Sequence, residues 1–97
     1  MFKYIMMCEY LTKQVVGYTR GVRRPLLVAN DLAPLIAATE SEVSKELQIR
    51  NPNCLKSEKW EVKDEKHMER VFFIDTPGTE DNGDAVRVII EQVPFKL

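Results

Sequence analysis

The spacing of apolar residues favours a helix near the start of the chain. Over residues 3–13 the apolar positions recur at intervals of three and four residues, and Met, Leu, Glu and Lys dominate the segment, as in many helices. The same region also fits a hairpin whose two arms are residues 2–6 and 14–18. Helix and hairpin both remain open for this region.

The clearest amphipathic pattern lies at residues 31–49. Its apolar residues form one stripe at helical spacing: Leu32, Leu35, Ile36, Val43 and Leu47. This stripe predicts a single helix, which Asn51-Pro52-Asn53 would end. The same residues also fit two short helices joined by a turn between Ala37 and Ser41.

The second half of the chain has the patterns of strands separated by polar loops. Residues 59–63 alternate between polar and apolar, as a half-buried strand does. Residues 71–74 and 85–93 are richer in apolar residues and predict more deeply buried strands. The segments between them, residues 64–69 and 76–84, are polar and predict loops.

These elements predict one small α+β domain that spans residues 1–97. A helix or helix pair would be followed by a three-stranded antiparallel sheet, which is a winged-helix-like arrangement. The alternative is a ββαβββ fold in which one sheet packs on one helix. Because a long apolar last strand at a sheet edge invites pairing with a second copy, we also expect a homodimer.

The letters D-L-A-x-x-x-A-A-T-x-S-E-V-S-K at residues 31–45 resemble the helix-turn-helix of bacterial repressors. Together with a hairpin over residues 59–74, residues 31–74 resemble a winged-helix domain. In such domains the second helix enters the major groove of DNA. The resemblance implies a small regulatory protein that binds nucleic acid through Ser41, Lys45 and Gln48.

The resemblance also implies phosphate contacts from the hairpin, or wing: Lys63, Lys66, His67 and Arg70. The sequence departs from the family at two places. Ala37 and Ala38 stand where the family usually has a glycine, which the turn needs for its positive φ. The outward side chains would include Glu42 and Glu46, which repel phosphate.

A cluster of arginines at residues 17–24 is a second candidate for anion binding. Arg20, Arg23 and Arg24 accompany two glycines and a tyrosine, a combination that clamps phosphate or stacks on a base. The same arginines can also pair with acidic groups elsewhere in the fold or in a second subunit. That alternative favours a protein-interaction module or a homodimer without nucleic-acid binding.

Composition indicates a globular protein and argues against a dedicated nucleic-acid-binding protein. The 97 residues are 44% hydrophobic and 30% charged, and the net charge of −1 lacks the basic surplus that phosphate binding favours. No apolar run approaches the ~20 residues of a membrane helix, and the N-terminus does not resemble a signal peptide. The two cysteines fit reduced thiols, so we expect a cytoplasmic protein with no membrane contact.

Two short patterns resemble enzyme motifs, but neither is complete. Asp75-Thr76-Pro77-Gly78 resembles the D-x-x-G of GTPases, whose G-x-x-x-x-G-K-[S/T] is absent. Glu61-Val62-Lys63 resembles the E-x-K of metal-dependent nucleases, which also need a second carboxylate. We therefore expect no catalytic residue, metal or cofactor. A nuclease-like enzyme is only the third class, after the nucleic-acid-binding regulator and the interaction module.

Overall fold

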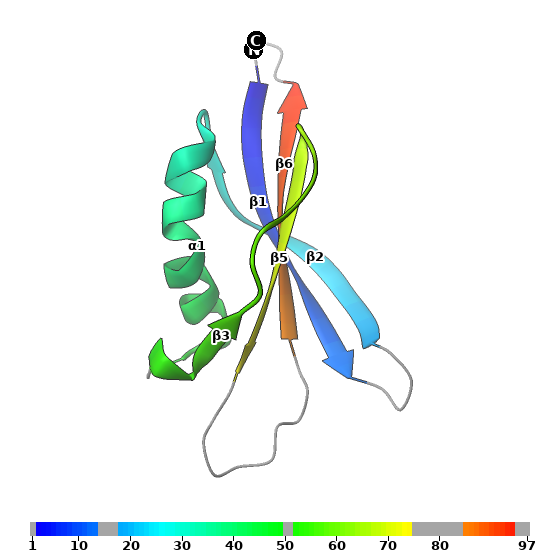
Figure 1. Cartoon of the computed structure of the whole chain (residues 1–97), viewed down its shortest axis with the longest axis vertical. Helices are drawn as coiled ribbons and strands as arrows, with labels where there is room; N and C mark the ends of the chain where they lie inside the picture. Colours follow the sequence, from blue (N-terminus) through cyan, green and yellow to red (C-terminus); the bar gives the residue numbers. More distant parts are fainter. Residues whose placement is uncertain (1, 14–17, 50–51, 75–84, 95–97) are drawn as a thin grey trace.

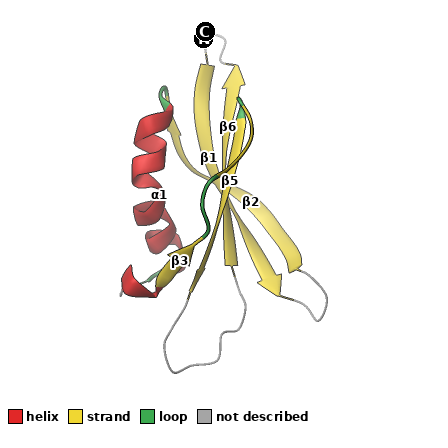
Figure 2. Cartoon of the chain, viewed as in Figure 1, coloured by secondary structure: helices red, strands yellow, loops and turns green. Residues whose placement is uncertain are grey.

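The computed structural model describes residues 2–13, 18–49, 52–74 and 85–94. Within these ranges the chain forms a six-stranded antiparallel sheet with one α-helix on one face (Figures 1 and 2). The strand order is β2-β1-β6-β5-β3, and β4 also pairs with β5. In chain order the elements are β1 (Phe2–Lys13), β2 (Tyr18–Ala29), α1 (Leu32–Leu47), a 3-10 turn (Pro52–Cys54), β3 (Leu55–Ser57), β4 (Glu61–Asp64), β5 (His67–Ile74) and β6 (Ala85–Pro94).

This architecture shows that the predicted fold class is wrong. We expected a helix or helix pair followed by three strands, but the described residues hold two long strands before the helix and four strands after it. The ββαβββ alternative also has one strand too few. Residues 3–13 form a strand because β1 lies between β2 and β6 and carries apolar residues on both faces, which hides the alternation of a half-buried strand.

The helix α1 is unbroken over Leu32–Leu47, so the chain reversal between Ala37 and Ser41 is absent. Alanine is the strongest helix former and resists the positive φ that the turn would require. In the middle of the helix, the Thr39 hydroxyl donates a hydrogen bond to the Leu35 carbonyl oxygen at 2.8 Å. The predicted helix-turn-helix and the winged-helix arrangement built on it are therefore wrong.

The last strand, β6, lies inside the sheet rather than at its edge. Ile90 of β6 is paired with Met6 of β1 on one side and with Met68 of β5 on the other. An apolar strand that is covered on both faces is typical of a central position, and Ile89 is fully buried as well. The last strand therefore cannot provide the edge through which we expected two copies to pair.

The strand β2 forms one edge of the sheet and contains two β-bulges. Its register with β1 shifts twice, each time by one extra residue in β2. At one bulge, a Cβ on Gly21 would lie 3.3 Å from Cβ and from the carbonyl oxygen of Tyr10, so this crowded position favours glycine. At the other bulge, Leu26 and Leu27 both pack against the core. Bulges and Pro25 make this edge a poor template for a further strand.

A continuous apolar row crosses the helix side of the sheet. It takes one residue from each of five strands: Leu27, Met6, Ile90, Met68 and Val62. The helix packs mainly over β2, β1 and β6, so it covers only part of this row. Met6 and Ile90 are buried, whereas Val62 at the β4 end is 66% exposed. The row therefore ends in an apolar surface that α1 does not cover.

Candidate functional site

The arginines of β2 are paired within the chain. Arg23 donates from Nε to Oε2 of Glu9 at 3.1 Å, and its Nη1 lies 3.6 Å from Oε1 of Glu91. Arg24 donates from Nη1 to Oε1 of Glu46 in α1 at 2.6 Å. The side chain of Arg20 lies outside the described part of the structure. Arg23 and Arg24 therefore bind acidic groups of the same fold and do not converge on one anion site.

Arg70, the predicted wing contact, connects β5 to the segment after β3 and to the helix. Its Nε donates to the Glu58 carbonyl oxygen at 3.0 Å and to Ser57 Oγ at 3.2 Å. Its Nη2 donates to Oε1 of Glu40 at 3.3 Å, and Cζ lies 4.6 Å from the centre of the Phe72 ring. The Arg70 side chain is only 18% exposed. It therefore acts as a structural cross-link between β5, the β3 segment and α1.

The other predicted contacts lie at separate places. In β4, the Nζ of Lys63 donates to Oε1 of Glu61 at 2.7 Å. Ser41, Lys45 and Gln48 line a hollow along the C-terminal half of α1. Lys66 lies in the turn between β4 and β5. The residues that sequence reasoning grouped into one nucleic-acid surface are thus distributed over the helix, both sheet faces and a turn.

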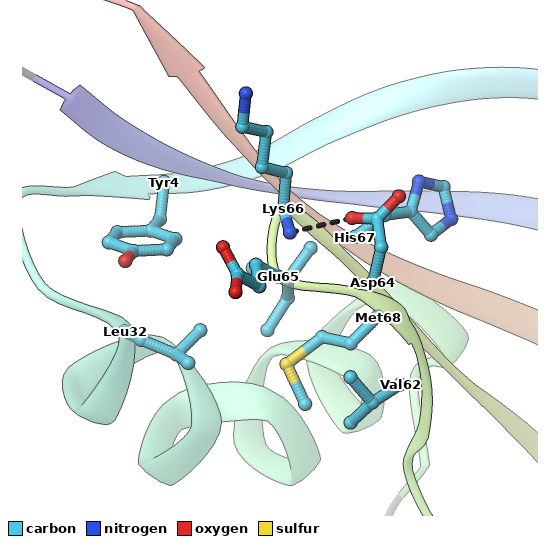
Figure 3. A pocket seen from close by; sticks show the side chains of 9 residues that line it. Tyr4, Leu32, Val62, Asp64, Glu65, Lys66, His67 and Met68 are labelled. Atoms are coloured by element: carbon cyan, nitrogen blue, oxygen red, sulfur yellow. Dashed lines mark hydrogen bonds between the residues drawn. The ribbon is translucent and has the colours of Figure 1, made fainter.

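The structure instead reveals a pocket where the apolar row leaves the cover of the helix. This pocket of about 150 Å³ lies between the start of α1 and the β4–β5 turn (Figure 3). Residues 64–67 of the turn complete its lining. Its apolar walls come from Tyr4 of β1, Leu32 of α1, Val62 of β4, Met68 of β5 and Ile90 of β6.

The β4–β5 turn places one acidic side chain at the mouth of this pocket. Oδ1 of Asp64 accepts a hydrogen bond from the backbone N–H of Lys66 at 2.6 Å, which fixes the turn. Figure 3 shows the Glu65 carboxylate beside the Tyr4 ring, whereas the ammonium group of Lys66 points away from the apolar walls. The charged group nearest the mouth is therefore the Glu65 carboxylate.

On the opposite face of the sheet, a belt of ion pairs holds the strands that carry the pocket. The belt consists of Arg23, Glu9, Arg87, Glu91, His67, Glu69, Lys63 and Glu61. His67, the first residue of β5, has Nε2 at 3.2 Å from Glu69 Oε1 and Nδ1 at 3.2 Å from Glu91 Oε1. The His67 ring therefore lies between a carboxylate of β5 and a carboxylate of β6.

The charge of Glu69 is favoured by its surroundings. Burial acts to raise the pKa of this carboxyl group, but the hydrogen bond from His67 and the positive charges of Arg87 and Lys63 outweigh it. The pKa of Glu69 is therefore lower than its ordinary value. The ionised form of Glu69 is therefore favoured, on the face of β5 that lies opposite the pocket.

The titratable groups beneath α1 are not activated for catalysis. The Cys8 thiol is fully buried, and burial together with the charge of Glu46 raises its pKa, which makes the thiolate scarce. Burial and Glu46 also raise the pKa of Tyr10, whose hydroxyl donates to Oε1 of Glu46 at 3.2 Å.

Of the two patterns that resemble enzyme motifs, the structure describes only Glu61-Val62-Lys63. Glu69 of the neighbouring strand β5 lies opposite Glu61, and Lys63 Nζ lies 2.7 Å from Glu61 Oε1 and 4.0 Å from Glu69 Oε2, so the lysine is paired with both carboxylates. Residues 75–78 lie outside the described residues. Within the described ranges, no group of three or more His, Cys, Asp or Glu side chains is arranged to hold a metal ion.

Comparison with known proteins identifies no relative: no family model, no curated protein and no solved structure matches this chain. Among the described helices, none has the length and apolar content needed to cross a membrane.

Sequence reasoning did not find this pocket. The sequence pattern assigns Val62 to a strand and Met68 to a polar loop, and it separates Tyr4 from Ile90 by most of the chain. Only the pairing of β1 with β6 and of β5 with β4 brings these residues together. The one available signal was the presence of Val62 and Met68 within the otherwise polar residues 61–70.

Proposed function

We propose that this domain is a small non-enzymatic protein-interaction module whose pocket receives one apolar side chain of a partner protein. The observation that carries the proposal is the apolar row that runs out from under α1. At its uncovered end, Val62 is 66% exposed and lines the pocket beside Met68. An occupant would remove this surface from water, and burying one large apolar side chain contributes about 1.5–3 kcal/mol.

The size of the pocket restricts what it can hold. An apolar cavity of about 150 Å³ accommodates a ring the size of benzene, whereas pockets for drug-sized molecules and cofactors measure about 300–1,000 Å³. The volume here is about 150 Å³. One aromatic or branched aliphatic side chain fits this space, and a nucleotide does not.

The nucleic-acid alternative has less support. Its helix-turn-helix is replaced by one continuous helix. Arg23, Arg24 and Arg70 are each engaged with acidic or polar groups of the same chain. Phosphate binding would have to break these pairs before it released any counterion.

The proposal is tested by NMR titration with blocked amino acids as probes. We expect N-acetyl-leucine amide and N-acetyl-phenylalanine amide to shift the methyl signals of Leu32, Val62 and Met68 at millimolar concentration. N-acetyl-alanine amide should shift them far less, because one methyl group fills little of the pocket. The proposal fails if all three probes act alike or if the shifts occur elsewhere on the domain.

A pair of matched variants separates the pocket from general surface effects. Val62→Gln removes an exposed apolar wall of the pocket, whereas Val22→Gln changes a valine that is 82% exposed in the edge strand β2. Both replacements are at exposed strand positions, so we expect little change in the unfolding midpoint. Only Val62→Gln should reduce the response to the leucine probe, by about threefold or more.

A further inference from the structure

We infer that the partner presents its apolar anchor next to a positively charged residue, so that the pocket receives a short basic and apolar segment. This inference rests on the proposed function and names the chemistry of the partner. It is carried by the Glu65 carboxylate, which lies beside the Tyr4 ring at the edge of an apolar pocket of about 150 Å³ (Figure 3).

The Glu65 carboxylate of the β4–β5 turn lies where a residue beside the anchor would pass. Figure 3 shows this carboxylate beside the Tyr4 ring, at the edge of the apolar walls. The Asp64 carboxylate lies beside the His67 ring instead, where it accepts the hydrogen bond from the backbone N–H of Lys66. A cation at this entrance would interact with Glu65, and the neighbouring Tyr4 ring offers the π face that cations also favour.

The cations of the same turn are directed elsewhere. The Lys66 ammonium group points away from the pocket (Figure 3). The ring of His67 lies between Glu69 and Glu91 in the ion-pair belt on the other face of the sheet. The local charge at the entrance is therefore negative, although the whole chain has a net charge of only −1.

The positive charge belongs beside the anchor and not on it. The walls of the pocket are the side chains of Tyr4, Leu32, Val62, Met68 and Ile90. An ammonium or guanidinium group buried against such walls would lose its hydration without a partner, at a cost of several kcal/mol. In an extended segment the next residue lies about 3.3 Å along the chain, so an apolar anchor and a cation at the mouth fit one short peptide.

The inference is tested with three capped tripeptides and the full chain at low salt. The probes are Ac-Arg-Leu-Arg-NH₂, Ac-Glu-Leu-Glu-NH₂ and Ac-Arg-Ala-Arg-NH₂, and binding is followed by the NMR signals of Leu32, Val62 and Met68. We expect the Arg-Leu-Arg peptide to bind at least about threefold more tightly than the Glu-Leu-Glu peptide, because exposed charge pairs are worth about 0.2–1 kcal/mol each. The Arg-Ala-Arg peptide should bind weakest.

Two glutamate variants assign the preference to the mouth. Glu65→Gln removes the negative charge of the mouth, and Glu58→Gln removes the charge of an exposed glutamate before β4 that does not line the pocket. We expect Glu65→Gln alone to bring the ratio of the two leucine-peptide affinities close to one. High salt should have the same effect, since it screens exposed charges.

The possible results separate this inference from the proposed function. If both leucine peptides bind the pocket equally, or if the acidic one binds more tightly, the inference is wrong and the apolar pocket stands. If neither leucine peptide shifts the pocket signals, the inference and the proposed function both fail. If the Arg-Leu-Arg peptide is preferred but Glu58→Gln abolishes the preference as fully as Glu65→Gln does, the mouth is not its source.

Discussion

Replacing Arg70 by methionine tests whether this residue is a structural cross-link. Methionine keeps most of the aliphatic stem over Phe72 but removes the guanidinium group. The variant therefore loses the hydrogen bonds to Ser57 Oγ and to the Glu58 carbonyl oxygen, the contact with Glu40, and the stacking 4.6 Å from the centre of the Phe72 ring.

The expected loss of stability follows from how exposed each contact is. The pair with Glu40, whose side chain is 68% exposed, contributes at most about 1 kcal/mol. The hydrogen bonds from a charged donor that is itself only 18% exposed contribute more, about 1.5–3 kcal/mol, and the cation–π contact adds about 0.5–2 kcal/mol. We expect Arg70→Met to lower the free energy of unfolding by about 3 kcal/mol, a large part of the 5–15 kcal/mol that is usual for a domain.

Urea unfolding followed by Trp60 fluorescence measures this effect. Trp60 is the only tryptophan, and the Arg70 guanidinium lies 5.8 Å from the centre of its ring, so far-UV circular dichroism is recorded in parallel to report on the whole fold. With an m-value of about 1–3 kcal/mol/M, the midpoint should fall by about 1–3 M. Lys45→Met is the control: its side chain is 72% exposed, and its midpoint should barely move. If Arg70→Met unfolds at the wild-type midpoint, the cross-link does not stabilise the fold and the guanidinium is available for a ligand.

Three further predictions concern the core, the thiols and the belt. Met6→Ala should lower stability by about 2–5 kcal/mol in urea unfolding, because Met6 is fully buried in the apolar row; a loss below about 1 kcal/mol would contradict this packing. Ellman's reagent should modify the part-exposed Cys54 before the buried Cys8, whose pKa burial raises; equal rates would argue against that burial. Burial acts to raise the pKa of Glu69, but His67, Arg87 and Lys63 lower it overall, so its stabilising effect is present above the ordinary carboxyl pKa and is lost as the pH falls through the lowered value. Glu69→Gln should therefore flatten the acid limb of a plot of stability against pH, and an unchanged limb would show that the belt does not stabilise the folded state.

The last strand and the helix were the most predictable parts of the fold. The sequence predicts a last strand at residues 85–93, and β6 forms at Ala85–Pro94. The amphipathic stripe at residues 31–49 likewise lies on α1, at Leu32–Leu47. In both cases the signal is local: an amphipathic stripe or a continuous apolar run can be recognised from residues that are close together in the sequence.

The first strand and its partners were not predictable in the same way. In β1, one set of alternate residues faces α1 and the other set faces the ion-pair belt, and Met6, Cys8 and Leu11 are all buried. With apolar residues on both faces, the strand loses its period of two and acquires chance helical spacings. The hairpin alternative ended its first arm at residue 6, although β1 continues to Lys13.

The candidate site was hidden for a related reason. The pocket unites Tyr4, Leu32, Val62, Met68 and Ile90, and no two of them form a recognisable motif. Their proximity depends on which strands pair and on how much of the sheet the helix covers. Both are determined by the fold as a whole. The basic residues were conspicuous in the sequence, but their acidic partners, such as Glu9 for Arg23 and Glu46 for Arg24, lie far away along the chain.

The pairing of β1 with β6, in which Phe2 lies opposite Pro94, has a consequence for synthesis on the ribosome. The nascent chain exposes the apolar face of β1 early, but the strand that completes its pairing leaves the exit tunnel after every other described strand of the sheet. Until then the first hairpin and the helix lack the centre of their sheet, because contacts distant in sequence form late. A chaperone that shields this hairpin during translation would therefore raise the yield of native protein.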